Sequence, residues 1–243
     1  MAIFGAGLTA GTINAVIGSG SLVTFPTLLA LGYAPVVANV SNTVGLVPGS
    51  LSAAYGYRRE LRGQRGRVLR LGVASTLGAL TGGILLLLLP ADAFERVVPF
   101  MLLAACGLMA AQPRLSRLLP QVEGGGREGG LAMVAVFATG VYGGYFGAAQ
   151  GVMLIALLAV FVPDDLQRLN GLKNALVSGV NGVTALLFLA IAPVAWEAAA
   201  LIAFGSIVGG LVGAHFGRTI PAGLLRILVI SVGCSVAVWL LLR

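Results

Sequence analysis

Long apolar stretches separated by short polar ones follow one another along the whole chain. Read in windows of about 19 residues, they form these apolar segments: 3–31, 34–57, 68–90, 94–112, 131–161, 166–191, 196–217 and 222–242. A helix that crosses a bilayer needs about 20 apolar residues, and the runs lack the alternation of membrane β-strands. The pattern predicts an all-α polytopic membrane protein.

Two of these segments are long enough to hold two helices each, and both are interrupted. Segment 3–31 is interrupted at residues 18–21 and segment 131–161 at residues 143–151, where glycine and small polar residues gather. Glycine permits backbone that a continuous helix does not adopt, and each half would be about 20 Å long. We expect a broken or re-entrant helical hairpin in each segment.

The composition agrees with a membrane protein. Of the 243 residues, 58% are hydrophobic and 9% are charged, against roughly 25% charged residues in a soluble domain. Two cysteines are too few for a disulfide scaffold. The net charge of +7 would fit a nucleic-acid partner, but six arginines gather between Arg58 and Arg70, as in a cytoplasmic loop. We therefore expect contact with the lipid bilayer and no nucleic-acid partner.

The arginines also bear on how the broken segments run. If segment 131–161 enters the membrane and returns, Arg168 and Arg218 lie inside with the loop 58–70, whereas a full crossing puts both outside. The first layout fits the positive-inside rule better. Applied to segment 3–31 as well, it gives each half one hairpin and three crossings. The halves then have opposite orientations, which is an inverted repeat.

Matching residues in the two halves favour a duplication, although glycine-rich helices also resemble one another by composition. At an offset of 129, the matching residues are Gly11, Gly18 and Ser21 with Gly140, Gly147 and Gln150. After a slip of two residues, they are Asn39, Asn42, Thr43 and Ser50 with Asn170, Lys173, Asn174 and Asn181. We expect a first transmembrane repeat in residues 1–112, a cytoplasmic linker in 113–130 and a second repeat in 131–243.

Segment 166–191 carries a polar stripe on one helical face. The stripe consists of Asn170, Asn174, Ser178 and Asn181. Lys173, the only lysine in the chain, lies beside it with no acidic residue within a helical turn. An unpaired cation in the membrane costs roughly 3 kcal/mol or more, and an anionic ligand would offset that cost. A lysine that snorkels to the cytoplasmic interface is the alternative, and asparagines that join helices are the alternative for the stripe.

The breaks supply anion chemistry of their own. A half-helix that begins near Ser21 or Gln150 points free N–H groups and a positive dipole end at the interior, where anions bind without a charged side chain. Close helix packing at the glycines is the alternative. The predicted substrate-binding residues are Asn14, Ser19, Gly20, Ser21, Asn39, Asn42, Thr43, Gln150, Gly151, Asn170, Lys173, Asn174 and Asn181.

The sequence carries no motif of an enzyme. HExxH, CxxC, GxSxG and P-loop patterns are absent, so we expect no catalytic residue, no metal ion and no cofactor. An integral-membrane enzyme or subunit that uses Cys106 or His215 remains an alternative.

Several stretches resemble a known family. They are Gly7 to Ser21 with Phe25-Pro26, then Ala38 to Thr43 with Pro48-Gly49-Ser50 and Tyr57-Arg58-Arg59, and finally Asn170 to Asn174. They are similar to the sulfite exporter TauE/SafE family over nearly the whole chain. The resemblance implies transport of sulfur-containing anions, such as sulfite or sulfonates, across the bacterial inner membrane.

Together these features predict a transporter of small anions that works by alternating access around a midplane site. An anion channel is the first alternative, and it would show conductance without saturation. The expected partners are a small anionic substrate and the bilayer, with a homodimer as one candidate assembly. The sequence leaves open the exact anion, the direction of transport and any coupling ion.

Overall fold

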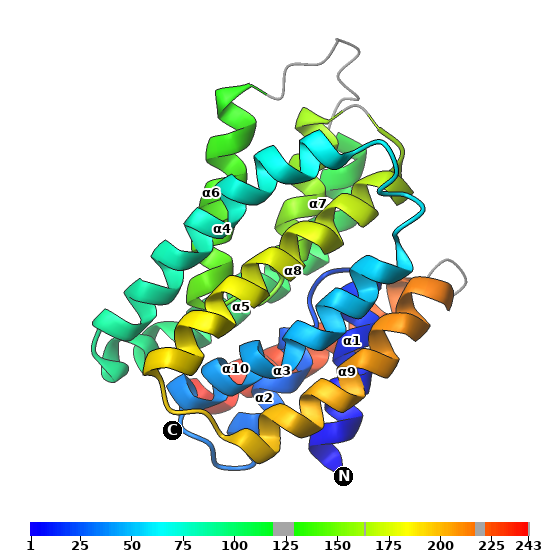
Figure 1. The fold of residues 1–243 in the computed structure, drawn as a ribbon. Helices are drawn as coiled ribbons and strands as arrows, with labels where there is room; N and C mark the ends of the chain where they lie inside the picture. The colour runs from blue at the N-terminus through cyan, green and yellow to red at the C-terminus, as the bar shows by residue number, and fades with distance from the viewer. Residues whose placement is uncertain (119–128, 163, 217–221, 243) are drawn as a thin grey trace.

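A computed structural model describes residues 1–118, 129–162, 164–216 and 222–242, and every regular element in these ranges is an α-helix (Figure 1). The helices are α1 Ala2–Val16, α2 Ser21–Ala30, α3 Pro35–Gly56, α4 Arg65–Leu88, α5 Ala91–Leu118, α6 Gly130–Tyr145, α7 Gln150–Phe161, α8 Leu166–Ile191, α9 Trp196–Phe216 and α10 Ala222–Leu241. The all-α prediction is confirmed. α5 continues to Leu118, so the first part of the predicted linker 113–130 is helical, and residues 119–128 lie outside the described ranges.

Both long apolar segments are broken where the glycines predicted a break. α2 begins at Ser21 and α7 at Gln150. The backbone is left-handed at Gly18 (φ 89°) and Gly147 (φ 76°), a conformation that glycine adopts without steric cost. These two glycines are 129 residues apart, as the matching residues of the two halves require.

The chain turns back on itself at each break. A Cβ atom on Gly20 would lie 3.0 Å from the carbonyl carbon of Ala10, ten residues earlier in α1. In the second half, the hydroxyl of Tyr142 in α6 donates to the carbonyl oxygen of Ala148 beyond the break (2.6 Å). α2 packs on α1 and α7 packs on α6, so each broken segment is a helical hairpin.

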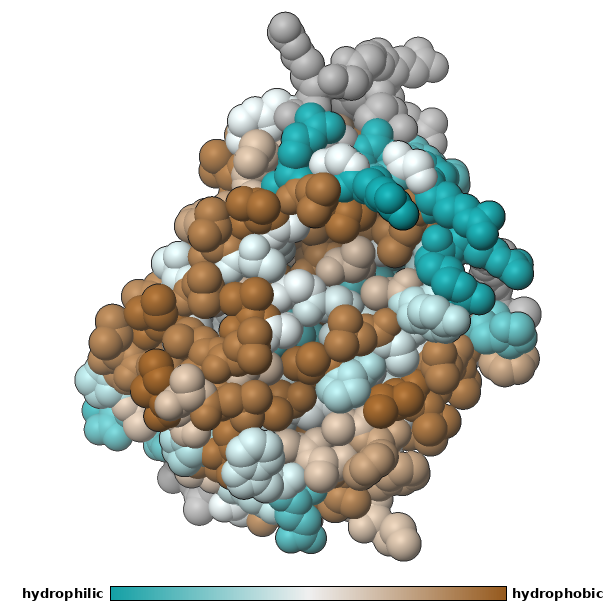
Figure 2. Space-filling view, viewed as in Figure 1, coloured by the Kyte–Doolittle hydropathy of each residue, from teal (hydrophilic) through white to brown (hydrophobic). Residues whose placement is uncertain are grey.

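The outer surface is suited to lipid. Among the described residues, four helices are long and apolar enough to cross a membrane: α4, the Ala91–Ala111 part of α5, α8 and α9. Large apolar side chains point outward along them, among them Leu77 of α4, Phe100 of α5 and Leu186 of α8. Figure 2 shows hydrophobic residues over much of one face and hydrophilic residues gathered at one end. This is the surface of a protein whose solvent is the bilayer.

Helices of one half pack most closely on helices of the other. α1 lies against α9, and α6 lies against α4. Glycines four residues apart permit both approaches, because a Cβ atom at any of them would collide with a carbonyl oxygen of the facing helix. The glycines and the facing residues are Gly78 with Phe137, Gly82 with Val141, Gly209 with Leu8, and Gly213 with Thr12.

The residues in these four contacts are spaced by the same two offsets, 129 and 131 residues, that relate the two halves of the sequence. Gly78 and Gly209 are 131 residues apart, and their partners Leu8 and Phe137 are 129 apart. The correspondence favours the predicted duplication. The opposite orientation of the two halves in the membrane stays a prediction.

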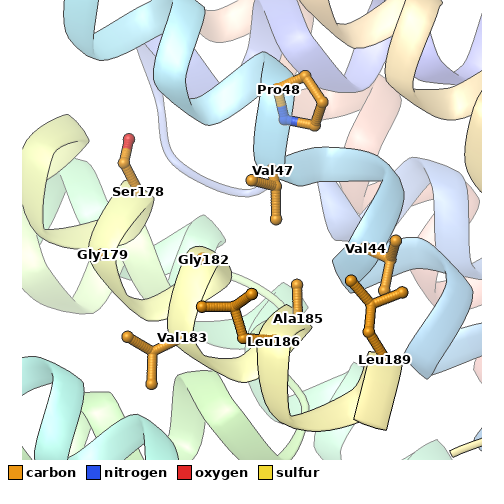
Figure 3. A pocket seen from close by; sticks show the side chains of 10 residues that line it. All are labelled: Val44, Val47, Pro48, Ser178, Gly179, Gly182, Val183, Ala185, Leu186 and Leu189. Carbon is orange, nitrogen blue, oxygen red and sulfur yellow. The ribbon is translucent and has the colours of Figure 1, made fainter.

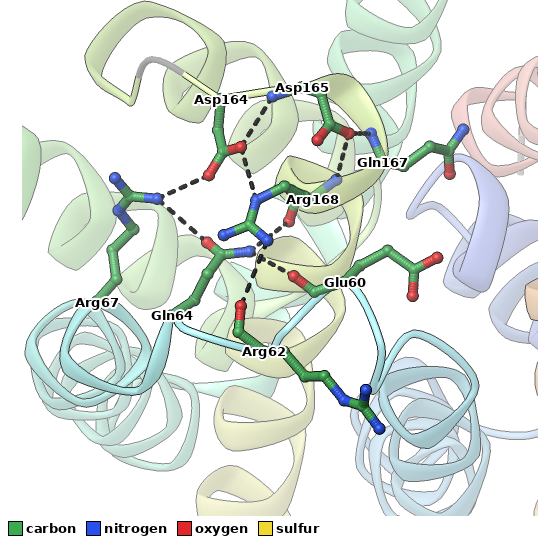
Figure 4. Close-up of polar contacts among 8 residues, drawn as sticks. All are labelled: Glu60, Arg62, Gln64, Arg67, Asp164, Asp165, Gln167 and Arg168. Atoms are coloured by element: carbon green, nitrogen blue, oxygen red, sulfur yellow. Dashed lines mark hydrogen bonds and ion pairs between the residues drawn. The ribbon is translucent and has the colours of Figure 1, made fainter.

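A polar cluster joins the linker between α3 and α4 to the start of α8 (Figure 4). Asp164 accepts from Arg67 (2.9 Å) and from Arg168 (2.7 Å). Arg168 also donates to the carbonyl oxygen of Arg62 (3.3 Å), and the Gln64 side-chain amide donates to the carbonyl oxygen of Arg168 (3.3 Å). The start of α8 therefore lies at the basic end of the molecule.

That position agrees with the layout in which segment 131–161 enters and returns, because Arg168 then shares a side with the loop 58–70. The other arginine used in that argument, Arg218, provides no test, because it lies outside the described ranges.

Cysteine labelling tests this layout, because Arg62 and Leu166 are exposed at the basic end whereas Glu197 is exposed at the start of α9. In a background of Cys106→Ala and Cys234→Ala, we expect a membrane-impermeant maleimide on whole cells to label Glu197→Cys only. Arg62→Cys and Leu166→Cys should react after the cells are opened. Labelling of Leu166→Cys from outside would contradict the re-entrant layout.

Candidate functional site

The two broken hairpins meet in the interior of the protein. The N–H of Gly151, at the start of α7, donates to the carbonyl oxygen of Gly18 in the first break (2.9 Å). A Cβ atom on Gly151 would lie 2.7 Å from the same oxygen, so no larger residue fits here. The contact brings the first break, between α1 and α2, against the beginning of α7.

Lys173 of α8 reaches this place from the side. Its side chain is fully buried, and its Nζ donates to the carbonyl oxygens of Asn14 (3.1 Å) and Ala15 (3.3 Å) near the end of α1. Asn174 Nδ2 donates to the same Ala15 oxygen (3.1 Å). The last carbonyls of a helix lack intrahelical partners and carry partial negative charge, so they stabilise the ammonium.

These contacts correct the expectation that Lys173 is unpaired, and they also decide against the snorkelling alternative. The lysine does have hydrogen-bond partners. They are backbone carbonyls of α1, so a search for acidic side chains within its own helix misses them. It also does not snorkel, because the side chain is fully buried and its Nζ bonds the end of α1.

Asn39 of α3 contacts the end of α6, the first helix of the other hairpin. Its Nδ2 donates to the carbonyl oxygen of Tyr145, the last residue of α6 (2.9 Å). α8 thus caps the end of α1, and α3 caps the end of α6. Polar side chains of α8 and α3 thus each hold the first helix of the hairpin in the opposite half.

At the start of α2, polar side chains form a chain of hydrogen bonds. Asn42 Nδ2 donates to Ser21 Oγ (3.2 Å), and Thr24 Oγ1 donates to Asn42 Oδ1. Thr24 is missing from the predicted site, although its place three residues after Ser21 puts it on the same helical face.

At the start of α7, the backbone donors are used within the protein. Gln150 N–H donates to the carbonyl oxygen of Gly147 (3.2 Å) and Gly151 N–H to that of Gly18. The expectation of free backbone donors at these two residues is therefore wrong. The Gln150 side chain lies over Gly143 and is buried. Its Nε2 and the Oδ1 of Asn39 have no partner among the described residues.

Of the remaining predicted residues, Asn14, Thr43 and Ser19 are buried, whereas Asn170 and Asn181 are half-buried. Asn14 is buried, with its Cβ 3.1 Å from the Cβ position of Gly20. Thr43 Oγ1 donates to the Asn39 carbonyl oxygen in its own helix (2.9 Å), and Ser19 Oγ lies 3.8 Å from Met109 Sδ.

Asn170 and Asn181 are half-buried. In the described ranges, neither makes a hydrogen bond with the other predicted residues. Ser178 of the same stripe instead joins α8 to α3, by donating to the Ser50 carbonyl oxygen (2.7 Å).

A groove of about 540 Å³ separates α3 from α8 further along their length (Figure 3). Val44, Val47 and Pro48 line it from α3, and Val183 and Leu186 from α8. The residues that line it are mostly apolar, and none of them is charged.

The helical fold, the lipid-facing surface and the buried polar centre define a polytopic membrane protein. The family model of the sulfite exporter TauE/SafE matches residues 3–240, and the chain belongs to this family. It is a membrane transporter and a multi-pass protein of the bacterial inner membrane.

Curated relatives cover almost the whole chain. A "Probable membrane transporter protein ORF9" of Sinorhizobium sp is 25% identical over 98% of this chain and 91% of its own. A "Probable membrane transporter protein YfcA" of Escherichia coli (strain K12) is 26% identical, and the match covers 98% of this chain and 88% of the relative. A "Probable membrane transporter protein" of Haemophilus influenzae is 25% identical, and the match covers 94% of this chain and 89% of the relative. No solved structure matches the chain.

Proposed function

We propose that this transporter moves small anions, most favourably sulfur oxyanions such as sulfite and sulfonates, through a site where the two broken hairpins meet. The observation that carries the proposal is the buried Lys173. Its hydrogen-bond partners are neutral carbonyl groups. The described carboxylates lie in linkers or at helix ends, at Glu60, Asp92, Glu95, Asp164, Asp165 and Glu197. The centre therefore keeps a positive charge that an anion would balance.

The Gln150 amide supports the same reading. A buried N–H group without an acceptor costs about 1–3 kcal/mol, and an oxyanion that accepts from Nε2 would remove this cost. Gln150 belongs to α7, next to the contact between Gly151 and Gly18. An oxyanion would thus lie between the charged end of the Lys173 side chain and a neutral amide donor.

The cross-connections of the hairpins support alternating access. The end of α1 is held by α8, and the end of α6 is held by α3. Movement of one hairpin against these helices would open the site to one side of the membrane and close it to the other, as in inverted-repeat transporters. An interior-negative potential contributes about 2.3 kcal/mol per charge per 100 mV to anion export.

Thermal unfolding of the purified protein in the presence of sulfite, sulfate, thiosulfate, a sulfonate or chloride tests the proposal. At 100 times its dissociation constant, a ligand adds about 2.7 kcal/mol, or roughly 5–10 °C for a chain of this size. We expect sulfur oxyanions to stabilise the protein more than chloride does.

Two variants, Gln150→Met and Asn181→Leu, test whether Gln150 contacts the anion. Gln150→Met should require at least tenfold more anion for the same shift, because it removes the buried donor. Asn181→Leu changes a half-buried residue of the stripe that makes no hydrogen bond with the other predicted residues in the described ranges, and it should leave the response unchanged. Equal responses of Gln150→Met and the unaltered protein would remove Gln150 from the site, and ion currents that do not saturate would mean a channel.

A further inference from the structure

A polar pocket of about 540 Å³ lies between the end of α3 and the end of α9. Arg58, Arg59 and His215 give it basic walls, and Glu60 is its acidic residue. The Arg58 guanidinium lies 4.3 Å from the centre of the Tyr55 ring and donates to the Tyr55 carbonyl oxygen (3.1 Å). These contacts hold one guanidinium in a fixed orientation at the pocket wall.

We propose that this pocket binds the headgroup of an acidic phospholipid. Two guanidinium groups against one carboxylate leave the pocket with a net positive charge. Guanidinium groups match the geometry of phosphate oxygens with paired N–H donors. Basic pockets between membrane helices on the cytoplasmic side suit anionic headgroups. The pocket lies at the end of the protein that carries the arginine-rich linker, which the positive-inside rule places in the cytoplasm.

The surface beside the pocket distinguishes a lipid from a free phosphate ion. Leu211 and Tyr55 line the pocket and are themselves exposed. Along the outer face of α9, Phe204 and Val208 continue this apolar surface at helical spacing, and both are exposed. Acyl chains can therefore lie along α9 while the phosphate contacts Arg58 and Arg59. A free phosphate would make no use of that surface.

The function of the site is to join α3 to α9. α9 packs on both α1 and α3, so a headgroup that contacts Arg58 of the linker and His215 of α9 would hold this group of helices together. The inference does not depend on which anion is transported, because the pocket is separate from the place where the hairpins meet.

The test compares thermal unfolding of the full-length protein with short-chain phosphatidylglycerol, short-chain phosphatidylcholine and inorganic phosphate. We expect phosphatidylglycerol alone to raise the unfolding temperature. In Arg58→Gln/Arg59→Gln, at least tenfold more phosphatidylglycerol should be needed for the same shift. Arg62→Gln/Arg65→Gln is the matched control, because it removes two exposed arginines from the same end but outside the pocket.

Three other results would overturn the proposal. An equal shift with phosphatidylcholine would mean that headgroup charge is not recognised. An equal shift with inorganic phosphate would make the ligand a free anion. An equal loss in Arg62→Gln/Arg65→Gln would assign the effect to general surface charge. Sulfite stabilisation that persists in Arg58→Gln/Arg59→Gln would show that the transport site is intact.

Discussion

Replacing Lys173 by Met is expected to abolish the stabilisation by anions and to reduce transport at least tenfold, while the protein still folds. Methionine fills much of the same space without the charge that an anion would balance. The Ala15 oxygen keeps Asn174 as a donor, but the Asn14 oxygen loses Lys173. One buried carbonyl without that partner costs about 1–3 kcal/mol, which we expect to see as a lower unfolding temperature without ligand.

Asn174→Ala separates the two roles of Lys173. This variant removes a hydrogen bond to the end of α1 and leaves the ammonium in place. We expect lower stability and an unchanged anion response, measured by thermal unfolding with sulfite and by uptake into vesicles. If Lys173→Met responds to sulfite at the same concentrations as the unaltered protein, the charge is not part of the site. If Asn174→Ala also loses the response, the capping of α1 matters rather than the charge.

The breaks could be predicted from the sequence because they depend on local chemistry. A run of about 20 apolar residues defines a membrane helix, and glycines within a longer run mark the place where the helix is interrupted. α2 and α7 begin at Ser21 and Gln150, the residues that the sequence indicated. The two offsets between the halves also appear in the packing, where Gly82 and Gly213 face the carbonyls of Val141 and Thr12.

The contacts of the site could not be predicted, because they join residues far apart in the chain. Lys173 is 159 positions from Asn14, and Asn39 is 106 positions from Tyr145. Their acceptors are backbone carbonyls, which every residue has, so no side-chain pattern marks them. Helical periodicity predicted one polar stripe in α8, but it did not show that Ser178 of this stripe would donate to the Ser50 carbonyl oxygen of α3.

The largest effect on folding is expected from Gly82→Leu in α4. A Cβ atom at Gly82 would collide with the Val141 carbonyl oxygen and lie 2.8 Å from the Tyr145 nitrogen, both in the backbone of α6. Backbone atoms cannot rotate aside as a side chain can, so α4 and α6 must separate. Overpacking of this kind costs 1–3 kcal/mol and occasionally more. Because Tyr145 ends α6 at the second break, we expect the cost at or above the upper end of that range.

Gly72→Leu is the matched control, since it makes the same substitution in the same helix where no atom lies within 4 Å of the added Cβ. Leucine is a better helix former than glycine by roughly 0.8–1 kcal/mol, so this variant should be neutral or slightly stabilised. Gel filtration in detergent and thermal unfolding measure both. We expect a monodisperse peak for Gly72→Leu and aggregation for Gly82→Leu. Gly213→Leu in α9 should behave like Gly82→Leu, because its Cβ would lie 2.6 Å from the Thr12 carbonyl oxygen in α1. If Gly82→Leu and Gly72→Leu were equally stable, α4 and α6 would not approach each other through glycine, and the packing that positions the second break would be wrong.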